Sequence, residues 1–337
     1  MNKSKKSEPL ITVLMAVYNG ERWLHDSINS ILQQTYINFE FIIINDGSND
    51  NSLQIINEFA FNDKRINVYN KKNSGLTDSL NYGIQKAKGK WIARIDADDI
   101  SNPCRLKKQL EYTFINEDIV LVGSGLVIID ENGKHGKTYT YSAKSSSLKQ
   151  RLSKGLPFFA HSSAFFKLST VEELGGYRPQ FIRSQDQDLW LRLAQVGKIA
   201  CIKEPLVLLR KHDQQISLDN SGQRQFIFSH MAMTSYFLRR MGHADPMEKI
   251  IEKEIDHFYN FILSKLEEQN FFEFQVFLHK FKIKISKTNS FKSKFNILVK
   301  SFIFTPNFLY RYIKYRFIGS DLPKKFALDW VRLTKKI

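Results

Sequence analysis

The amino-acid sequence predicts an α/β fold, with a mostly parallel sheet covered by helices on both faces and a helical, basic C-terminal extension. Three observations support this fold class. Short apolar runs alternate with amphipathic, helix-like segments through roughly the first hundred residues. A carboxylate cluster, Asp96-Ala97-Asp98-Asp99, directly follows the fourth apolar run. Beyond about residue 215 the pattern changes to long helices rich in Phe, Lys and Tyr.

Strands and helices are expected to alternate strictly in the first part of the chain. The expected strands are 11–17, 39–44, 66–69 and 90–95, and the expected helices are 21–33, 52–61 and 76–87. Because parallel strands need a crossover connection, this order predicts a mostly parallel sheet. No GxGxxG sequence follows the first strand, so the dinucleotide-binding fingerprint is absent.

The next segments carry weaker patterns. Helices are expected at 105–114 and 186–196, strands at 119–129 and 158–167, and a loop or short helix at 142–153. Asp130-Glu131-Asn132-Gly133 is typical of a hairpin turn. Segment 199–209 is expected to be an edge strand, because Pro205 has no N–H to donate to a neighbouring strand.

Composition narrows the class of protein. Cys104 and Cys201 form no disulfide framework and have no metal-ligand spacing, which fits a reducing, cytoplasmic compartment. No run of about 18 uncharged apolar residues occurs, so we expect no transmembrane helix. Net charge is +16, and residues 280–337, with fifteen Lys or Arg and two Asp, carry +13 of it. Such a tail suggests an anionic partner, either a lipid surface or nucleic acid.

The carboxylate cluster is the strongest sign of a functional site. Acidic side chains are rarely buried unless they are paired or bound to a cation. The carboxyl end of a strand in an α/β sheet is where ligands bind. Carboxylate oxygens suit Mg²⁺ or Mn²⁺, which commonly shares its coordination shell with substrate phosphates. Taken alone, the same residues also fit a solvated acidic turn with a helix cap.

Seven short motifs occur in a set order along the chain. They are Ala16-Val17-Tyr18-Asn19-Gly20, Ile44-Asn45-Asp46-Gly47-Ser48, Asn73-Ser74-Gly75, Asp96-Ala97-Asp98-Asp99, Gly175-Gly176-Tyr177-Arg178, Asp186-Gln187-Asp188-Leu189-Trp190 and Arg210-Lys211-His212. In this order they resemble the inverting glycosyltransferases of family 2, which have the Rossmann-like GT-A fold. The resemblance spans roughly 9–217. We expect a nucleotide-sugar half at 1–125, an acceptor half at 126–217 and a helical basic region at 218–337.

The resemblance implies a donor site at the carboxyl ends of the first strands. The residues that would bind the nucleotide-sugar are Ala16, Val17, Tyr18, Asp46, Asn73, Gly75, Asp96 and Asp98. Asp46 would accept a hydrogen bond from uracil, and Asn45 stands where the family usually has the first Asp of a pair. Asp98 would ligate Mn²⁺ or Mg²⁺, with His212 at the diphosphate or metal. The metal would neutralise the leaving nucleoside diphosphate.

The resemblance also implies a catalytic base, Asp186, which would take the proton of the acceptor hydroxyl. The family usually has Glu-Asp here, and this chain has Gln185-Asp186. The like-charge repulsion that would raise the pKa of the base is therefore missing. Asp188 is expected to hold the start of the helix. Gln185, Asp188 and His161 are candidates for the acceptor side.

We therefore expect a metal-dependent enzyme that transfers a sugar, from a UDP-sugar, to a glycan or lipid-linked oligosaccharide in cell-surface polysaccharide or lipopolysaccharide synthesis. The tail at 280–337 would hold it at the anionic inner face of the membrane. No nucleic acid partner is expected, because no nucleic-acid-binding motif occurs. Two alternatives remain: a nucleotide-sugar-binding module without turnover, suggested by Gln185, and a nucleic-acid-associated protein acting through the tail.

Overall fold

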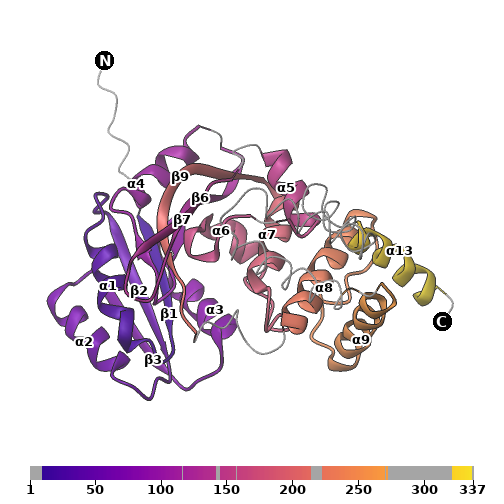
Figure 1. The fold of residues 1–337 in the computed structure, drawn as a ribbon, viewed down its shortest axis with the longest axis horizontal. Helices are drawn as coiled ribbons and strands as arrows, with labels where there is room; N and C mark the ends of the chain where they lie inside the picture. The colour runs from indigo at the N-terminus through magenta and orange to yellow at the C-terminus, as the bar shows by residue number, and fades with distance from the viewer. Residues whose placement is uncertain are drawn as a thin grey trace, which may run out of the picture. The chain divides into compact units, whose positions relative to one another are not determined.

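The computed structural model describes residues 10–115, 117–141, 145–156, 158–213, 222–269, 271 and 321–335. The chain divides into two compact units (Figure 1). Unit 1 comprises residues 1–150 and 158–219, and unit 2 comprises residues 151–157 and 220–337. The division of unit 1 into a donor half and an acceptor half stays a prediction.

The first part of unit 1 is a parallel sheet with helical crossovers. Its strands, in spatial order, are β3 (Ile66–Lys71), β2 (Phe39–Asp46), β1 (Ile11–Val17) and β4 (Trp91–Arg94). The crossovers are α1 (Glu21–Leu32), α2 (Ser52–Asn62) and α3 (Leu76–Lys86). Every residue of β2 is buried, so both faces of the sheet are covered. The predicted α/β fold class is confirmed.

The sheet continues through shorter, mixed strands. Its further elements are β5 (Ile100–Ser101), α4 (Arg105–Thr113), β6 (Ile119–Ile129), β7 (His135–Tyr139), α5 (Ser145–Ser153), β8 (Phe165–Lys167), α6 (Leu168–Glu173), α7 (Gln185–Val196) and β9 (Lys198–Arg210). The spatial order after β4 is β8, β6, β9, β5. The β6–β9 ladder is parallel, whereas β8 runs antiparallel to both of its neighbours. The predicted hairpin turn joins β6 to β7, and Gly133 supplies its positive φ of 84°.

Two expectations for this region are wrong. Segment 158–167 is a strand only at β8, and a 3-10 turn, η1 (His161–Ser163), precedes it. The Ser163 hydroxyl donates to the Ala160 carbonyl at 2.8 Å, a local bond that competes with strand pairing. The last part of strand β9 is not an edge, since β5 pairs with it at Val207 and Leu208. Pro205 lies where the β6–β9 register shifts, which removes its conflict with the ladder.

One buried core cluster lies on the α1 side of the sheet. Its inward residues come from alternate positions of β1 and β2 and from the apolar stripe of α1, such as Val13, Phe41 and Ile28. Each fully buried side chain of this kind contributes about 1.5–3 kcal/mol relative to its exposed state. The carboxyl ends of β1, β2 and β4 are therefore fixed by a close-packed core, and the candidate site lies on them.

Unit 2 is helical in its described residues. Its helices are α8 (Gly222–Arg240), α9 (Glu252–Glu268) and α13 (Leu322–Thr334). The Trp330 ring of α13 lies 4.9 Å from the Phe258 ring and 5.0 Å from the Phe261 ring of α9. The end of the basic tail thus packs as a structural helix, whereas residues 272–320 lie outside the described residues. No helix among the described residues is long and apolar enough to cross a membrane.

Candidate active site

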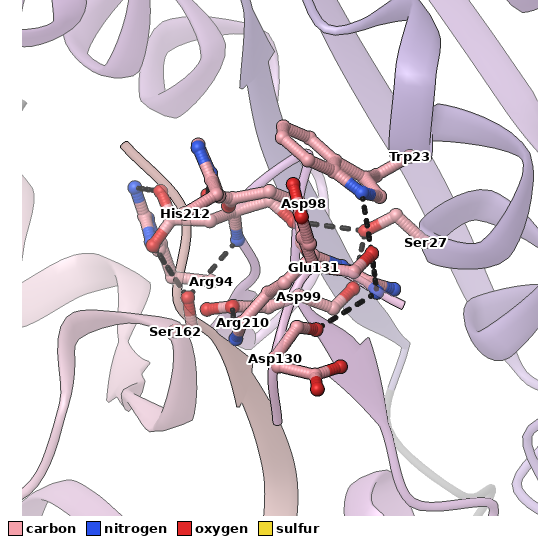
Figure 2. Close-up of polar contacts among 11 residues, drawn as sticks. Trp23, Ser27, Arg94, Asp98, Asp99, Asp130, Glu131, Ser162, Arg210 and His212 are labelled. Atoms are coloured by element: carbon pink, nitrogen blue, oxygen red, sulfur yellow. Dashed lines mark hydrogen bonds and ion pairs between the residues drawn. The ribbon is translucent and has the colours of Figure 1, made fainter. Parts of the chain in front are cut away.

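The acidic cluster lies directly after β4, at the carboxyl edge of the parallel strands (Figure 2). Asp96, Asp98 and Asp99 each bring one carboxylate oxygen to a common point, with these atoms within 4.8 Å of one another. Within the described part of the chain, these three carboxylates form the group of metal-ligating side chains that could hold an ion.

The three carboxylates have different surroundings. The buried guanidinium of Arg94 pairs with Asp96, and the Ser162 hydroxyl also donates to Asp96. Burial disfavours the charged form of Asp96, but the Arg94 charge holds its pKa below the usual value. Burial and the neighbouring carboxylates raise the pKa of Asp98, and raise that of Asp99 well above its usual value. A cation would relieve this repulsion.

His212 follows the last residues of β9 and faces the cluster. Its Nε2 lies 2.9 Å from Oδ2 of Asp98, and its side chain is 7% exposed. The ring of Trp23, from α1, lies against the imidazole with 4.0 Å between ring centroids and 34° between planes. The structure thus brings together Asp98 and His212, the two residues expected to hold the metal.

Arg210 ties the cluster to its surroundings from the buried side (Figure 2). Its side chain is 2% exposed, and its backbone N–H donates to Asp99 Oδ1 at 2.8 Å. The guanidinium partners are the carbonyl oxygens of Asp98 at 3.0 Å, Asp130 at 3.4 Å and Glu131 at 3.1 Å, and Asp26 Oδ2 at 3.2 Å. One side chain therefore joins the acidic loop, the β6–β7 turn and α1.

Asp46, at the end of β2, holds the loop that precedes α3. Its carboxylate accepts the backbone N–H groups of Ser74 and Gly75, both at 2.9 Å, and the Lys71 ammonium at 2.6 Å. Gly75 has a φ of 91°, which favours glycine. The structure thus shows Asp46 organising the loop of the third motif, and its predicted contact with uracil stays a prediction.

The remaining donor-side residues lie at the same edge. Val17 ends β1 and its side chain is buried in the core, whereas Tyr18 is 53% exposed, so the donor contacts expected of both residues stay predictions. Ala16 is half-buried. A Cβ on Gly47 would lie 2.7 Å from the backbone nitrogen of Asn73, so the second and third motifs pack closely.

Asp186 lies in the first turn of α7, after a residue in a strained conformation. Ser184 has a left-handed φ of 54°, a conformation that costs free energy for a residue with a side chain. Burial raises the pKa of Asp186, and the charges of Arg94 and Asp96 lie close enough to influence it. The expected base is therefore in electrostatic reach of the acidic cluster, and Gln185 beside it is half-buried.

Asp188 is fully buried, and its carboxylate forms ion pairs with two arginines. Its Oδ2 accepts from Nε of Arg178 and from Nε of Arg192, both at 3.0 Å, and its Oδ1 accepts from Nη2 of Arg178. Arg192 also donates to the carbonyls of Leu174 and Gly176. Asp188 therefore ties the loop before α7 to the helix through Arg178 and Arg192, and its expected role at the helix start stays a prediction. Its proposed place on the acceptor side stays untested.

His161 belongs to a buried aromatic group. Its Nε2 lies 2.7 Å from the Tyr177 hydroxyl, and the Trp190 ring packs against its imidazole. Burial and the nearby Arg94 charge lower the pKa of His161 well below its usual value. Any contact of His161 with an acceptor stays a prediction.

Sequence reasoning gave no role to Arg94, Arg210 or Ser162, and took Trp23 only as an inward-facing residue of a helix. One signal was available for the two arginines. Each stands at the end of an apolar strand, and a charge in such a pattern is costly unless it is paired. Nothing local marks Trp23 or Ser162, because their partners lie far away in the chain.

A mostly parallel sheet with an acidic cluster at the carboxyl edge of its strands is the arrangement of the GT-A glycosyltransferases, and the comparisons with known proteins agree with it. The model of the family described as Glycosyl transferase family 2 matches residues 12–175. The chain is 38% identical over 188 residues to the O-antigen biosynthesis glycosyltransferase WbnJ of Escherichia coli, which covers 55% of this chain and 71% of WbnJ. An uncharacterized glycosyltransferase of Methanocaldococcus jannaschii is 36% identical over 240 residues, 68% of this chain and 80% of that relative. The chain belongs to glycosyltransferase family 2.

A solved structure has the same fold. TarS of S. aureus, residues 1–349, in complex with UDP-GlcNAc, matches with a TM-score of 0.57 over 96% of this chain and 91% of TarS. The sequence identity is 16%, so this likeness concerns the fold alone.

Proposed function

We propose that this glycosyltransferase is a metal-dependent, inverting enzyme that uses a UDP-sugar and a hydroxyl of a glycan acceptor. One observation carries the proposal: the Asp98 carboxylate and the His212 imidazole lie 2.9 Å apart in the acidic cluster that follows β4. One side of the reaction needs a group that stabilises a leaving diphosphate, and the other needs a base. The TarS complex with UDP-GlcNAc supports the choice of donor class.

The residues present fit a hard divalent cation. Carboxylate oxygens are the preferred ligands of Mg²⁺ and Mn²⁺, and an imidazole is compatible with Mn²⁺. Asp98 and His212 are the side chains that would hold the ion, because Asp96 is paired with Arg94 and Asp99 accepts from Arg210. The bound ion would neutralise the developing charge of the leaving diphosphate.

Asp186 is proposed to accept the proton of the attacking hydroxyl. Burial raises the pKa of its carboxyl, which makes the carboxylate a stronger base than one on the surface. Attack from the face opposite the diphosphate would invert the anomeric centre. The buried Asp188 ion pairs keep the preceding loop in one conformation, so the base is held ready.

The acceptor is proposed to be a glycan or lipid-linked oligosaccharide of a cell-surface polysaccharide or lipopolysaccharide. WbnJ, a relative, is an O-antigen biosynthesis enzyme by name. Residues 280–337 carry a net charge of +13, which would attract the chain to an anionic membrane surface from the cytoplasmic side. The rival reading, a donor-binding module without turnover, predicts no donor hydrolysis in the presence of metal.

Donor binding tests the metal assignment. UDP affinity is measured by calorimetry on the full chain with and without Mn²⁺, for the wild type, Asp98→Asn and Asp118→Asn. We expect Asp98→Asn to lose the Mn²⁺-dependent part of UDP binding, because an amide is a poorer ligand for a hard cation. Asp118 precedes β6, exposes 71% of its side chain, and lies at the opposite end of the sheet, so Asp118→Asn should bind as the wild type. Wild-type affinity in Asp98→Asn would show that the metal site lies elsewhere.

A further inference from the structure

We infer that Trp23 is a positioning residue for His212, and that it fixes the imidazole by stacking where another site would use a second hydrogen bond. The inference deepens the proposed function, because it concerns a residue that would hold the metal. It assigns Trp23 no contact with the donor, the acceptor or the ion.

The imidazole of His212 has one hydrogen bond to the described residues. Its Nε2 pairs with Asp98, whereas its Nδ1 is buried and has no hydrogen-bond partner among the described residues. Metal-binding histidines usually donate from the second ring nitrogen to a carboxylate or carbonyl, which fixes the ring orientation. Among the described residues, no group supplies that constraint at His212.

The backbone adds little control over this ring. The last ladder contact of this strand is the Lys211 N–H, which donates to the Ile129 carbonyl at 2.8 Å. His212 follows that contact by one residue, so its side-chain torsions must be fixed by what the ring touches. The ring touches Asp98 at one edge and Trp23 at one face.

Trp23 is itself held firmly. It is 7% exposed, and its indole N–H donates to the Glu131 carbonyl at 3.1 Å (Figure 2). The Arg22 guanidinium carbon lies 4.7 Å from the indole centroid. A firmly held indole whose centroid lies 4.0 Å from that of the imidazole, with 34° between the planes, limits how far the imidazole can tip toward α1.

Three variants separate the stacking from other roles of Trp23. Trp23→Phe keeps an aromatic face and loses the indole N–H, and Trp23→Leu loses the face. Trp91→Leu is the matched control, because Trp91 is 5% exposed, stacks on Phe165, and lies at the opposite end of β4 from the acidic cluster. If Trp23→Leu does not fold, Trp23→Met replaces it, since methionine fills a similar space without a ring.

The first measurement needs no metal. Ring-labelled histidine is observed by NMR in the full chain, and His212→Gln identifies the His212 signal. An indole face at this distance shifts the imidazole C–H signals upfield. We expect Trp23→Leu to lose that shift, Trp23→Phe to keep part of it, and Trp91→Leu to leave it unchanged.

The second measurement is Mn²⁺ affinity in the presence of UDP, followed by the EPR signal of free Mn²⁺. Removing a residue that orients a ligand typically costs about 10–100-fold in metal affinity, and we expect this loss in Trp23→Leu. Trp23→Phe should stay within about threefold of the wild type, because the stacking face survives. Asp98→Asn, measured in the same assay, tests the proposed metal site itself, so failure of the metal site and failure of the Trp23 inference can be told apart.

Three results would overturn the inference. A folded Trp23→Leu with wild-type Mn²⁺ affinity would show that the ring needs no support. Equal losses in Trp23→Phe and Trp23→Leu would assign the effect to the indole hydrogen bond. An equal loss in Trp91→Leu would make the effect a general consequence of a damaged core.

Discussion

The buried carboxylate of Asp188 makes a sharp test, because the proposed base Asp186 lies two residues away on the same helix. Asp188→Asn removes one charge from a cluster in which Asp188 is 0% exposed and Arg178 and Arg192 are 11% and 7% exposed. Breaking a buried ion pair from one side costs about 3–5 kcal/mol. Arg192 keeps its two carbonyl partners, and asparagine keeps one acceptor, so we expect about 3 kcal/mol.

That loss is large enough to measure by calorimetry on the full chain at pH 7. For a unit of about 200 residues, 1 kcal/mol shifts the melting temperature by roughly 2–4 °C, so Asp188→Asn should melt about 6–12 °C lower. Asp186→Asn, the matched control, should melt at or above the wild-type temperature. Burial raises the pKa of Asp186, so the native state pays for the charged form at neutral pH and the amide removes that cost. Melting temperatures within 2 °C of each other for the two variants would refute the reasoning.

Three further predictions concern catalysis, the loop before α7 and the tail. Turnover by the wild type should rise with pH on an acidic limb above 3.8, the usual pKa of an aspartate, because burial raises the pKa of Asp186. Asp186→Asn should lower turnover by about 10²–10⁴ and remove that limb in a pH–rate profile. Gly176→Ala should unfold at a lower urea concentration than Gly175→Ala. Both glycines have positive φ, but of the two only Gly176 would bring a Cβ against another atom, Asn81 Oδ1 at 2.5 Å. An equal loss of stability in both variants would leave backbone strain as the cause. Replacing the Lys and Arg residues of 280–317 by Gln should weaken binding to anionic vesicles in a cosedimentation assay and leave UDP affinity unchanged. Unchanged vesicle binding would show that the tail does not attach the protein to the membrane.

Much of the fold could be predicted because local patterns determine it. Apolar runs of strand length and amphipathic helices in strict alternation lead to a parallel sheet through the crossover rule. The site cluster after β4 was visible for the same reason, since three carboxylates in four residues interrupt an otherwise buried pattern. The prediction of a strand at 158–167 failed where Ser162 and Ser163 bond to partners that the local pattern does not contain.

The supporting residues of the site could not be predicted, because their partners are distant in sequence. Arg210 reaches Asp26 across 184 positions and Glu131 across 79. The role of such a residue depends on how distant strands and turns are aligned in the fold, and a single sequence does not reveal that alignment. Asp188 shows the same limit. A carboxylate in the first turn of a helix suits the helix dipole, yet this one is committed to two arginines.

The β6–β7 turn touches the active site through its main chain. Arg210 bonds to the carbonyl oxygens of Asp130 and Glu131, and the Trp23 indole bonds to the second of these. A carbonyl oxygen is common to all residue types, so a substitution at Glu131 can leave these main-chain bonds in place. The Asp130 side chain, in contrast, accepts the backbone N–H groups of Asn132 and Lys134 and shapes the turn itself. Sequence change in this turn is therefore tolerated where Asp130 is kept and Gly133 keeps its positive φ.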